Sequence, residues 1–122
     1  MRFLMNLYMK EGIGTPPRAL IEKMDEHITA GFKSGTLLDA GGLYGTEDSK
    51  QVALRGGEVT VSDGPFAEAK EVVGGYAIVD VRDEAQAVEE ARQMIEVHRL
   101  WPEWEGFCEV RRIAEEPPTP TD

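Results

Sequence analysis

The spacing of hydrophobic positions changes several times along the chain, and each change marks a predicted element. Residues 2–8 are rich in strand formers and carry apolar side chains on both faces, so this predicted strand is expected to be covered on both sides. A first helix is predicted between Thr15, a capping residue followed by two prolines, and Gly35, a left-handed stop. Its expected apolar stripe comprises Leu20, Ile21, Met24, Ile28 and Phe32.

Strand patterns follow this helix. Residues 36–43 predict a second strand, and residues 50–62 alternate apolar and polar positions around Gly56-Gly57, a pair typical of a two-residue hairpin turn. Residues 75–81 are apolar on both faces, which is typical of a strand in the centre of a sheet. The middle of the chain therefore predicts a strand, a hairpin and a central strand.

A second helix is predicted from Asp83, which is a plausible N-cap with Gln86 three residues later, to about Arg99. Trp101-Pro102 ends it, and residues 106–113 predict a last strand. Cys108 and Val110 are expected to share one face of this strand. The stripe of the helix comprises Val88, Ala91, Ile95 and His98, flanked by Ala87 and Met94.

The resulting order is strand, helix, strand, hairpin, strand, helix, strand. Two helices that interrupt a mainly antiparallel sheet predict an α+β, ferredoxin-like domain over residues 1–113, with both helices on one face. Residues 114–122 predict a flexible, acidic and proline-rich tail. A second subunit is expected to cover the other sheet face and form a dimeric α/β barrel. The residues expected on that face include Leu4, Tyr8, Tyr76 and Ile78.

Composition narrows the classes of function. The chain has 122 residues, with 13 basic and 23 acidic side chains and a net charge of −10. Such a charge opposes binding to phosphate backbones, so no direct nucleic-acid partner is expected. No apolar run approaches the roughly 18 residues of a membrane span. Cys108 is the one cysteine and forms no disulfide within the chain, so a cytoplasmic protein is expected.

The run Val61-Ser-Asp-Gly-Pro-Phe-Ala-Glu-Ala-Lys-Glu71, followed by Gly74-Gly-Tyr76, resembles the signature of the YCII-related (DGPF) family. Residues 2–8 and 101–111 are also similar to it. The resemblance implies a bacterial protein with a ferredoxin-like fold that forms a dimeric α/β barrel as a homodimer. The motif positions matched are Asp63, Gly64, Pro65, Phe66, Glu68, Lys70 and Glu71.

The resemblance says less about activity. A histidine–aspartate pair has suggested enzymatic function for the wider group, but Met24 aligns with the histidine position, and His27 lies one turn away. That pair is therefore not carried over to this chain. Some family members are associated with alternative sigma factors, which implies a transcription-linked protein partner as an alternative.

The residues of the motif admit two interpretations. Asp63, Gly64 and Pro65 suit a rigid turn, because Asp accepts from nearby amides, Gly allows unusual backbone angles and Pro fixes the next bend. Alternatively, the turn presents Phe66 as an apolar wall and Asp63 or Lys70 as polar handles at a cleft. Glu68 and Glu71 would then cap the turn or pair with Lys70.

His98 is the main candidate for acid–base chemistry, since it continues the apolar stripe and is expected to point toward the sheet. Catalysis would need a carboxylate such as Asp80 within reach; otherwise His98 is a satisfied, partly buried histidine. His27 is expected at the surface or at the edge of the first helix. The aromatic residues Trp101, Trp104 and Phe107 are expected to pack against the core or a dimer interface, with ligand stacking as the alternative.

No metal or cofactor is expected. Two histidines 71 positions apart and one cysteine make no zinc-like cluster. The turn glycines Gly41-Gly42 and Gly56-Gly57 belong to no phosphate-binding motif. The preferred function is binding of a small organic ligand, with or without cofactor-free acid–base chemistry, and the sequence leaves open whether the protein is an enzyme. The candidate residues are His98 and Asp63 for catalysis and Tyr8, Phe66 and Lys70 for ligand binding. The alternative is a regulatory, non-catalytic module that acts through a transcription-related protein.

Overall fold

A computed structural model describes residues 1–66 and 69–121 of the chain. Its longer helices are α1 (Arg18–Ser34) and α2 (Glu84–Val97), and single 3-10 turns lie at Thr46–Asp48 (η1) and His98–Leu100 (η2). The strands are β1 (Arg2–Met9), β2 (Leu37–Gly42), β3 (Lys50–Arg55), β4 (Glu58–Asp63), β5 (Val72–Asp80) and β6 (Gly106–Arg112).

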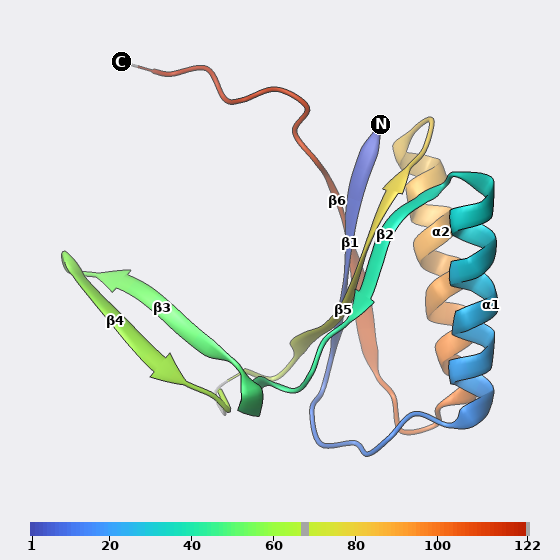
Figure 1. Cartoon of the computed structure of the whole chain (residues 1–122), viewed down its shortest axis with the longest axis horizontal. Helices are drawn as coiled ribbons and strands as arrows, with labels where there is room; N and C mark the ends of the chain where they lie inside the picture. The colour runs from blue at the N-terminus through green and yellow to red at the C-terminus, as the bar shows by residue number, and fades with distance from the viewer. Residues whose placement is uncertain (67–68, 122) are drawn as a thin grey trace.

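Four strands form an antiparallel sheet in the order β2-β5-β1-β6, and both helices cover the same face of it (Figure 1). This mixed α+β arrangement is compatible with a ferredoxin-like fold, as the order of predicted elements indicated. β5 lies between β1 and β2, so its predicted central place is confirmed. It begins three residues earlier than expected, because Val72 and Val73 still pair with the end of β1 beyond a register shift.

The two faces of the sheet differ in character. On β1, Phe3, Met5 and Leu7 are buried beneath the helices and form the core with residues of β5 and α2. The intervening side chains are only half buried and lie on the face that no helix covers, which we call the open face. By register, the open face comprises Leu4, Asn6, Tyr8, Tyr76, Ile78, Phe107, Glu109 and Arg111.

Helix α1 departs from its prediction at its start. Thr15 is not the cap; the helix begins at Arg18, and the carbonyl of Pro17 accepts from the amides of the first turn. The reason is steric, since a residue that precedes proline is pushed to extended backbone; Pro16 precedes Pro17 and therefore cannot be the first helical residue. The end was predicted correctly, because Gly35 adopts φ 81° and its amide bonds to Phe32.

The stripe of α1 is also narrower than predicted. Leu20 is buried and Met24 and Ile28 are half buried, whereas Ile21 and Phe32 are about half exposed. The helix faces the sheet along positions 20, 24, 28 and 31, and Gly31 allows close approach there. A Cβ at Gly31 would lie 2.9 Å from the Cβ of Leu37 in β2. The small residue therefore sets how near the helix lies to the sheet.

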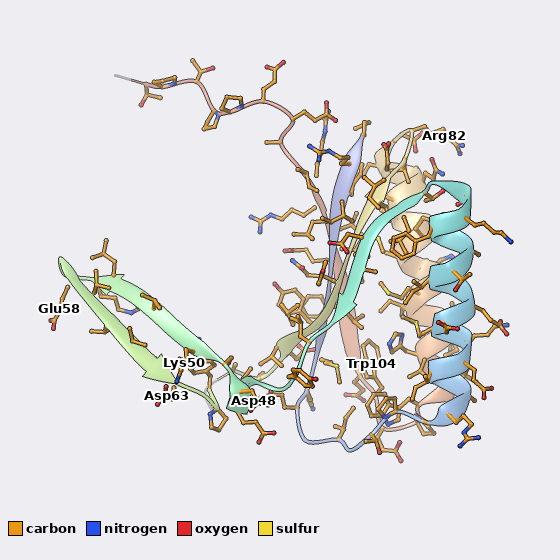
Figure 2. The ribbon with its side chains drawn as sticks, viewed as in Figure 1. Asp48, Lys50, Glu58, Asp63, Arg82 and Trp104 are labelled. Atoms are coloured by element: carbon orange, nitrogen blue, oxygen red, sulfur yellow. The ribbon has the colours of Figure 1, made fainter. Side chains whose placement is uncertain are left out.

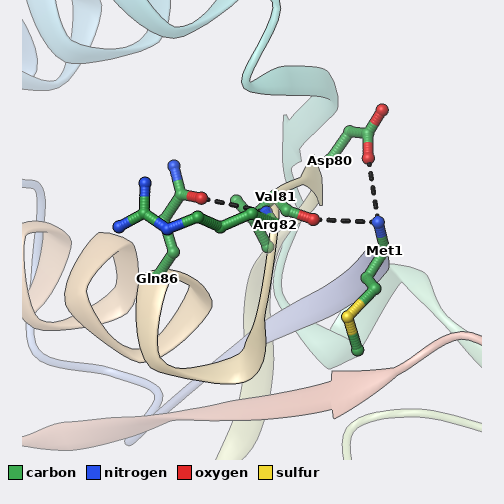
Figure 3. A network of polar contacts seen from close by, with 5 residues as sticks. All are labelled: Met1, Asp80, Val81, Arg82 and Gln86. Carbon is green, nitrogen blue, oxygen red and sulfur yellow. Dashed lines mark hydrogen bonds and ion pairs between the residues drawn. The ribbon is translucent and has the colours of Figure 1, made fainter.

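The predicted cap of α2 is confirmed, since Asp83 accepts from the Gln86 amide at 2.9 Å. The Gln86 side chain accepts from the backbone amide of Arg82 at 2.9 Å (Figure 3). The neighbouring β5 end is fixed by the Met1 ammonium, which donates to the Val81 carbonyl at 2.8 Å and to Asp80 at 3.3 Å.

The stripe of α2 is rotated by about one position from the prediction. Val88 is half exposed, and the buried positions of the helix and the turn after it are Ala87, Ala91, Met94 and His98. This spacing keeps one face against the sheet with little side-chain bulk, so α2 can lie close to it.

β3 and β4 form a separate hairpin that projects from the sheet on the side away from the helices (Figure 1). We call residues 50–63 the arm. The predicted turn is confirmed, since Gly56 and Gly57 adopt φ 57° and 78°. Residues 114–121 form neither helix nor strand. None of the helices in the described ranges is long and apolar enough to cross a membrane.

Candidate functional site

A cavity of about 810 Å³ lies where the N-terminal end of α1 meets the end of the sheet. Its volume is in the usual range for small-molecule sites. Apolar side chains from β1, α1 and β5 form its inner wall, and the loop of residues 10–17 covers its mouth. Its wall includes Leu7, Leu20, Met24, Ile28, Val73, His98, Trp101 and Trp104.

A second cavity of about 490 Å³ continues beneath α1 toward β2. The two cavities share Leu7, Met24, Ile28 and Gly74, so they adjoin along the inner face of the sheet. His27 is half buried and lines this second cavity, whereas the sequence placed it at the surface or helix edge. Met24 therefore lies at the junction of one elongated apolar space.

The loop over the mouth is tied across the cavity. Glu11 accepts from the backbone amide of Thr46 and from its hydroxyl, the latter at 2.7 Å. These hydrogen bonds lower the pKa of Glu11 below its usual value. Gly12 and Gly14, at φ 78° and 91°, allow the loop to fold back with Ile13 on the cavity wall.

His98 is the titratable group most enclosed by this site. Only 7% of it is exposed, and its Nδ1 lies 2.8 Å from the carbonyl oxygen of Met94. A carbonyl can only accept, so Nδ1 carries the proton and Nε2 is left as an acceptor. Burial lowers the pKa of His98 below its usual 6.5. The imidazole is therefore neutral at pH 7.

Trp104 packs against this histidine. The Trp104 ring (Figure 2) lies 4.5 Å from the imidazole centroid at a tilt of 40°, and the backbone amide of the buried Trp101 donates to the His98 carbonyl at 3.0 Å. Trp104 Nε1 is buried without a hydrogen-bond acceptor among the described residues. Phe107 is separate from them, because it lies on the open face and stacks on Tyr8 with 4.7 Å between ring centroids. The expected aromatic group is thus divided between the two sides of the sheet.

The DGPF motif forms the base of the arm. Asp63 pairs with Lys50 across the hairpin (Figure 2), and the Gly64 amide donates to the Ser49 carbonyl at 2.9 Å. A Cβ at Gly64 would lie 1.6 Å from the carbonyl oxygen of Thr46, so no larger residue fits this approach. The Phe66 amide lies 3.5 Å from the Thr46 hydroxyl. These contacts favour the interpretation of the motif as a rigid turn.

The other candidate residues lie apart from the cavity. Tyr8 is on the open face, Phe66 and Glu71 are half buried, and Lys70 is exposed. Of the two proposed catalytic residues, His98 lines the cavity, whereas Asp63 is exposed and paired with Lys50. Pro65 is the motif residue that reaches the cavity wall. Glu68 lies outside the described residues.

No carboxylate partner for His98 is found among the described residues. Asp80, named as a possible partner, instead receives a hydrogen bond from the Met1 ammonium. Cys108 is no better a nucleophile, since burial raises its pKa to about 11. The part of the chain that the structure describes contains no group of three potential metal ligands. The arrangement can hold an apolar molecule against one neutral imidazole.

Sequence reasoning missed the loop of residues 10–17 as part of the site. The usable signal was Ile13 between two glycines, because one apolar residue in so flexible a segment needs a place to bury. Met24 could not be recognised as a cavity residue, because a core residue and a residue on a cavity wall have the same helical spacing.

The approach of Gly64 to Thr46 gives the first prediction. Gly64→Ala should lower the free energy of unfolding by roughly 2 kcal/mol or more, because a backbone segment would have to move. Gly42→Ala is the matched control, since a Cβ there meets nothing within 4 Å. Urea unfolding of both variants tests this, and equal stabilities would contradict the assigned packing.

The burial of His98 predicts a dependence of stability on pH. Its pKa is lower in the folded than in the unfolded chain, so the unfolded chain binds the proton first as pH falls below 6.5. The free energy of unfolding should therefore decrease with falling pH, by at most about 1.4 kcal/mol per pH unit from this group. In urea titrations between pH 5.5 and 7.5, His98→Gln should flatten the dependence of the free energy of unfolding on pH. If the free energy of unfolding depends on pH equally in wild type and His98→Gln, the prediction is wrong.

Comparison with known proteins adds one finding to this geometry. No curated protein matches the chain. The family model described as YCII-related domain matches residues 1–117, which is nearly the whole of it. The chain therefore belongs to the YCII-related family.

Proposed function

We propose that this protein binds a small apolar organic molecule in the cavity beside His98. The observation that carries the proposal is the neutral imidazole on the wall of a cavity of about 810 Å³ that is otherwise mainly apolar. The proposal keeps the ligand-binding function expected from the sequence but moves the site. Tyr8, Phe66 and Lys70 are not among the residues that line this cavity.

The polar groups at the cavity favour a neutral ligand that carries a hydroxyl. Because Nδ1 of His98 is engaged with Met94, Nε2 is the nitrogen available to accept from the ligand. The mouth carries the acidic Glu11, Asp25 and Glu47 against Lys10, which disfavours a carboxylate ligand.

In its more specific form, the proposal includes cofactor-free acid–base chemistry on the bound ligand. His98 would take the proton of the bound hydroxyl at Nε2, since its lowered pKa keeps it unprotonated at neutral pH. A cytoplasmic location is also proposed, because Cys108 is the one cysteine of the chain and has no partner within it.

The second part of the proposal is a homodimer built on the open face, which would complete a dimeric α/β barrel. Leu4 and Ile78 are direct neighbours across β1 and β5, and no helix covers them. On the same face, Glu109 Oε1 makes no hydrogen bond among the described residues, and the Arg111 guanidinium lies 3.9 Å from it. A second copy would bury the apolar pairs and bring donors to this carboxylate.

The transcription-linked alternative uses the same surface. An open apolar face also fits a different protein, and the family's association with sigma factors gives that partner a class. This alternative requires the open face to be uncovered in the purified protein, whereas the homodimer covers it. The oligomeric state in solution separates the two.

Ligand binding is tested with 4-propylphenol and hexanoate as probes of similar size. The phenol should shift the His98 ring resonances in a saturable way, and hexanoate should bind at least tenfold more weakly. Met24→Phe fills the junction of the cavities and should weaken phenol binding about tenfold, whereas Val88→Phe on the exposed side of α2 should not. If neither probe gives a saturable shift, or both variants bind alike, this site is not the ligand site.

The dimer is tested at Ile78. Ile78→Lys places a charge at the centre of the open face and should raise the dimer dissociation constant at least tenfold. Val88→Lys serves as the control, because Val88 lies on the helix surface. Sedimentation equilibrium measures both. A wild-type chain that is monomeric at micromolar concentration, or an Ile78→Lys variant that dimerises normally, contradicts the proposed interface.

A further inference from the structure

The arm has two unlike faces. Cross-strand pairs alternate between them, as the register of β3 and β4 requires. One face carries the aliphatic pairs Val52–Val61 and Leu54–Val59, with the Lys50–Asp63 ion pair at its base. The other face carries Gln51–Ser62, Ala53–Thr60 and Arg55–Glu58. The hairpin is therefore built with a side to bury and a side for solvent.

That aliphatic side is uncovered in the single chain. Its four side chains are between 63% and 70% exposed. Among the described residues, the Lys50–Asp63 ion pair joins the two strands of the arm to each other, and the Gly64 amide bonds to the Ser49 carbonyl at its base. A two-stranded hairpin is at best marginally stable in water on its own. A partner that covers its aliphatic face would stabilise the hairpin.

The position of the arm indicates where the partner lies. The arm extends from the sheet on the same side as the open face, away from the two helices (Figure 1). Each strand has six residues, which corresponds to roughly 20 Å of reach. Packed sheets lie only about 10 Å apart. In a dimer formed through the open faces, each arm would extend past the plane of the partner's sheet and lie along one edge of that sheet.

Charge also favours a second copy. The chain has a net charge of −10, which opposes its self-association in general. The arm has no net charge, because its two basic residues, Lys50 and Arg55, balance Glu58 and Asp63. A neutral aliphatic surface has no attraction for phosphate or for a strongly basic partner. It suits the apolar surface of another copy, where two-fold symmetry buries both arms at once.

We propose that the arms are exchanged in the homodimer. The aliphatic face of each arm, formed by Val52, Leu54, Val59 and Val61, packs on one edge of the partner's four-stranded sheet. This inference rests on the proposed dimer and adds a second contact to it. The arm then contributes to assembly, and the DGPF motif at its base fixes the direction in which the arm leaves the subunit.

Matched double variants test the proposal. Leu54→Thr with Val59→Thr removes one aliphatic pair while keeping strand-forming residues, and should raise the dimer dissociation constant at least tenfold in sedimentation equilibrium. Gln51→Thr with Ser62→Thr changes a pair on the opposite face and should alter it less than twofold. If both double variants dimerise like wild type while Ile78→Lys does not, arm exchange is refuted and the dimer stands. A monomeric wild type refutes both and leaves the arm to a different protein.

A second measurement locates the arm directly. A spin label at Thr60→Cys, in a Cys108→Ser background, lies on the polar face of the arm. Spin-labelled chain at natural isotope abundance is mixed with ¹⁵N-enriched chain that carries no spin label. Only contacts between the two chains then broaden the amide signals that are observed. Broadening along one edge of the partner's four-stranded sheet is expected. Uniform spectra in the mixed dimer, or broadening confined to the partner's arm, would overturn the proposal.

Discussion

Burial of one face of β1 and β5 beneath two helices is the interaction on which the rest of this structure depends. Phe3, Met5 and Val79 supply the large side chains of the core, whereas α2 presents small residues such as Ala87 and Ala91. The sheet thus provides the bulk and α2 provides a close fit. Since this burial uses only one face of the sheet, it fixes which side chains remain outside.

The same asymmetry places the functional surfaces. On the covered side, α1 is held near β2 by Gly31, and apolar space remains beneath the helix toward its N-terminal end. His98 lies at that end because the stripe of α2 continues into the following turn. On the uncovered side, the open face and the arm lie together. The cavity and the open face, on which the two proposals rest, therefore lie on opposite faces of one sheet.

Much of the architecture could be predicted from local patterns. The turn at Gly56-Gly57, the stop at Gly35 and the cap at Asp83 each depend on a few neighbouring residues, and all three were predicted correctly. The errors concern rotation and distance. Val88 and Ile21 were assigned to buried stripes, but a small shift in the facing angle of each helix exposes them. Helical spacing does not fix that angle; packing against the sheet does.

The candidate site was harder to predict for the same reason. Placing His98 toward the sheet needed only helical periodicity, whereas its separation from Asp63 and Asp80 depends on the three-dimensional path of the chain. The motif at Asp63 to Phe66 was recognisable as a turn. Its close approach to Thr46 could not be read from the sequence, because the two segments are brought together only when the arm folds back.

Thr46 joins two parts of the molecule that are far apart in the sequence. Its amide and hydroxyl hold Glu11 of the loop beside the cavity, its hydroxyl also lies 3.5 Å from the Phe66 amide, and its carbonyl lies against Gly64 at the base of the arm. The loop and the base of the arm therefore contact the same residue, so a substitution at Thr46 would remove contacts of both at once.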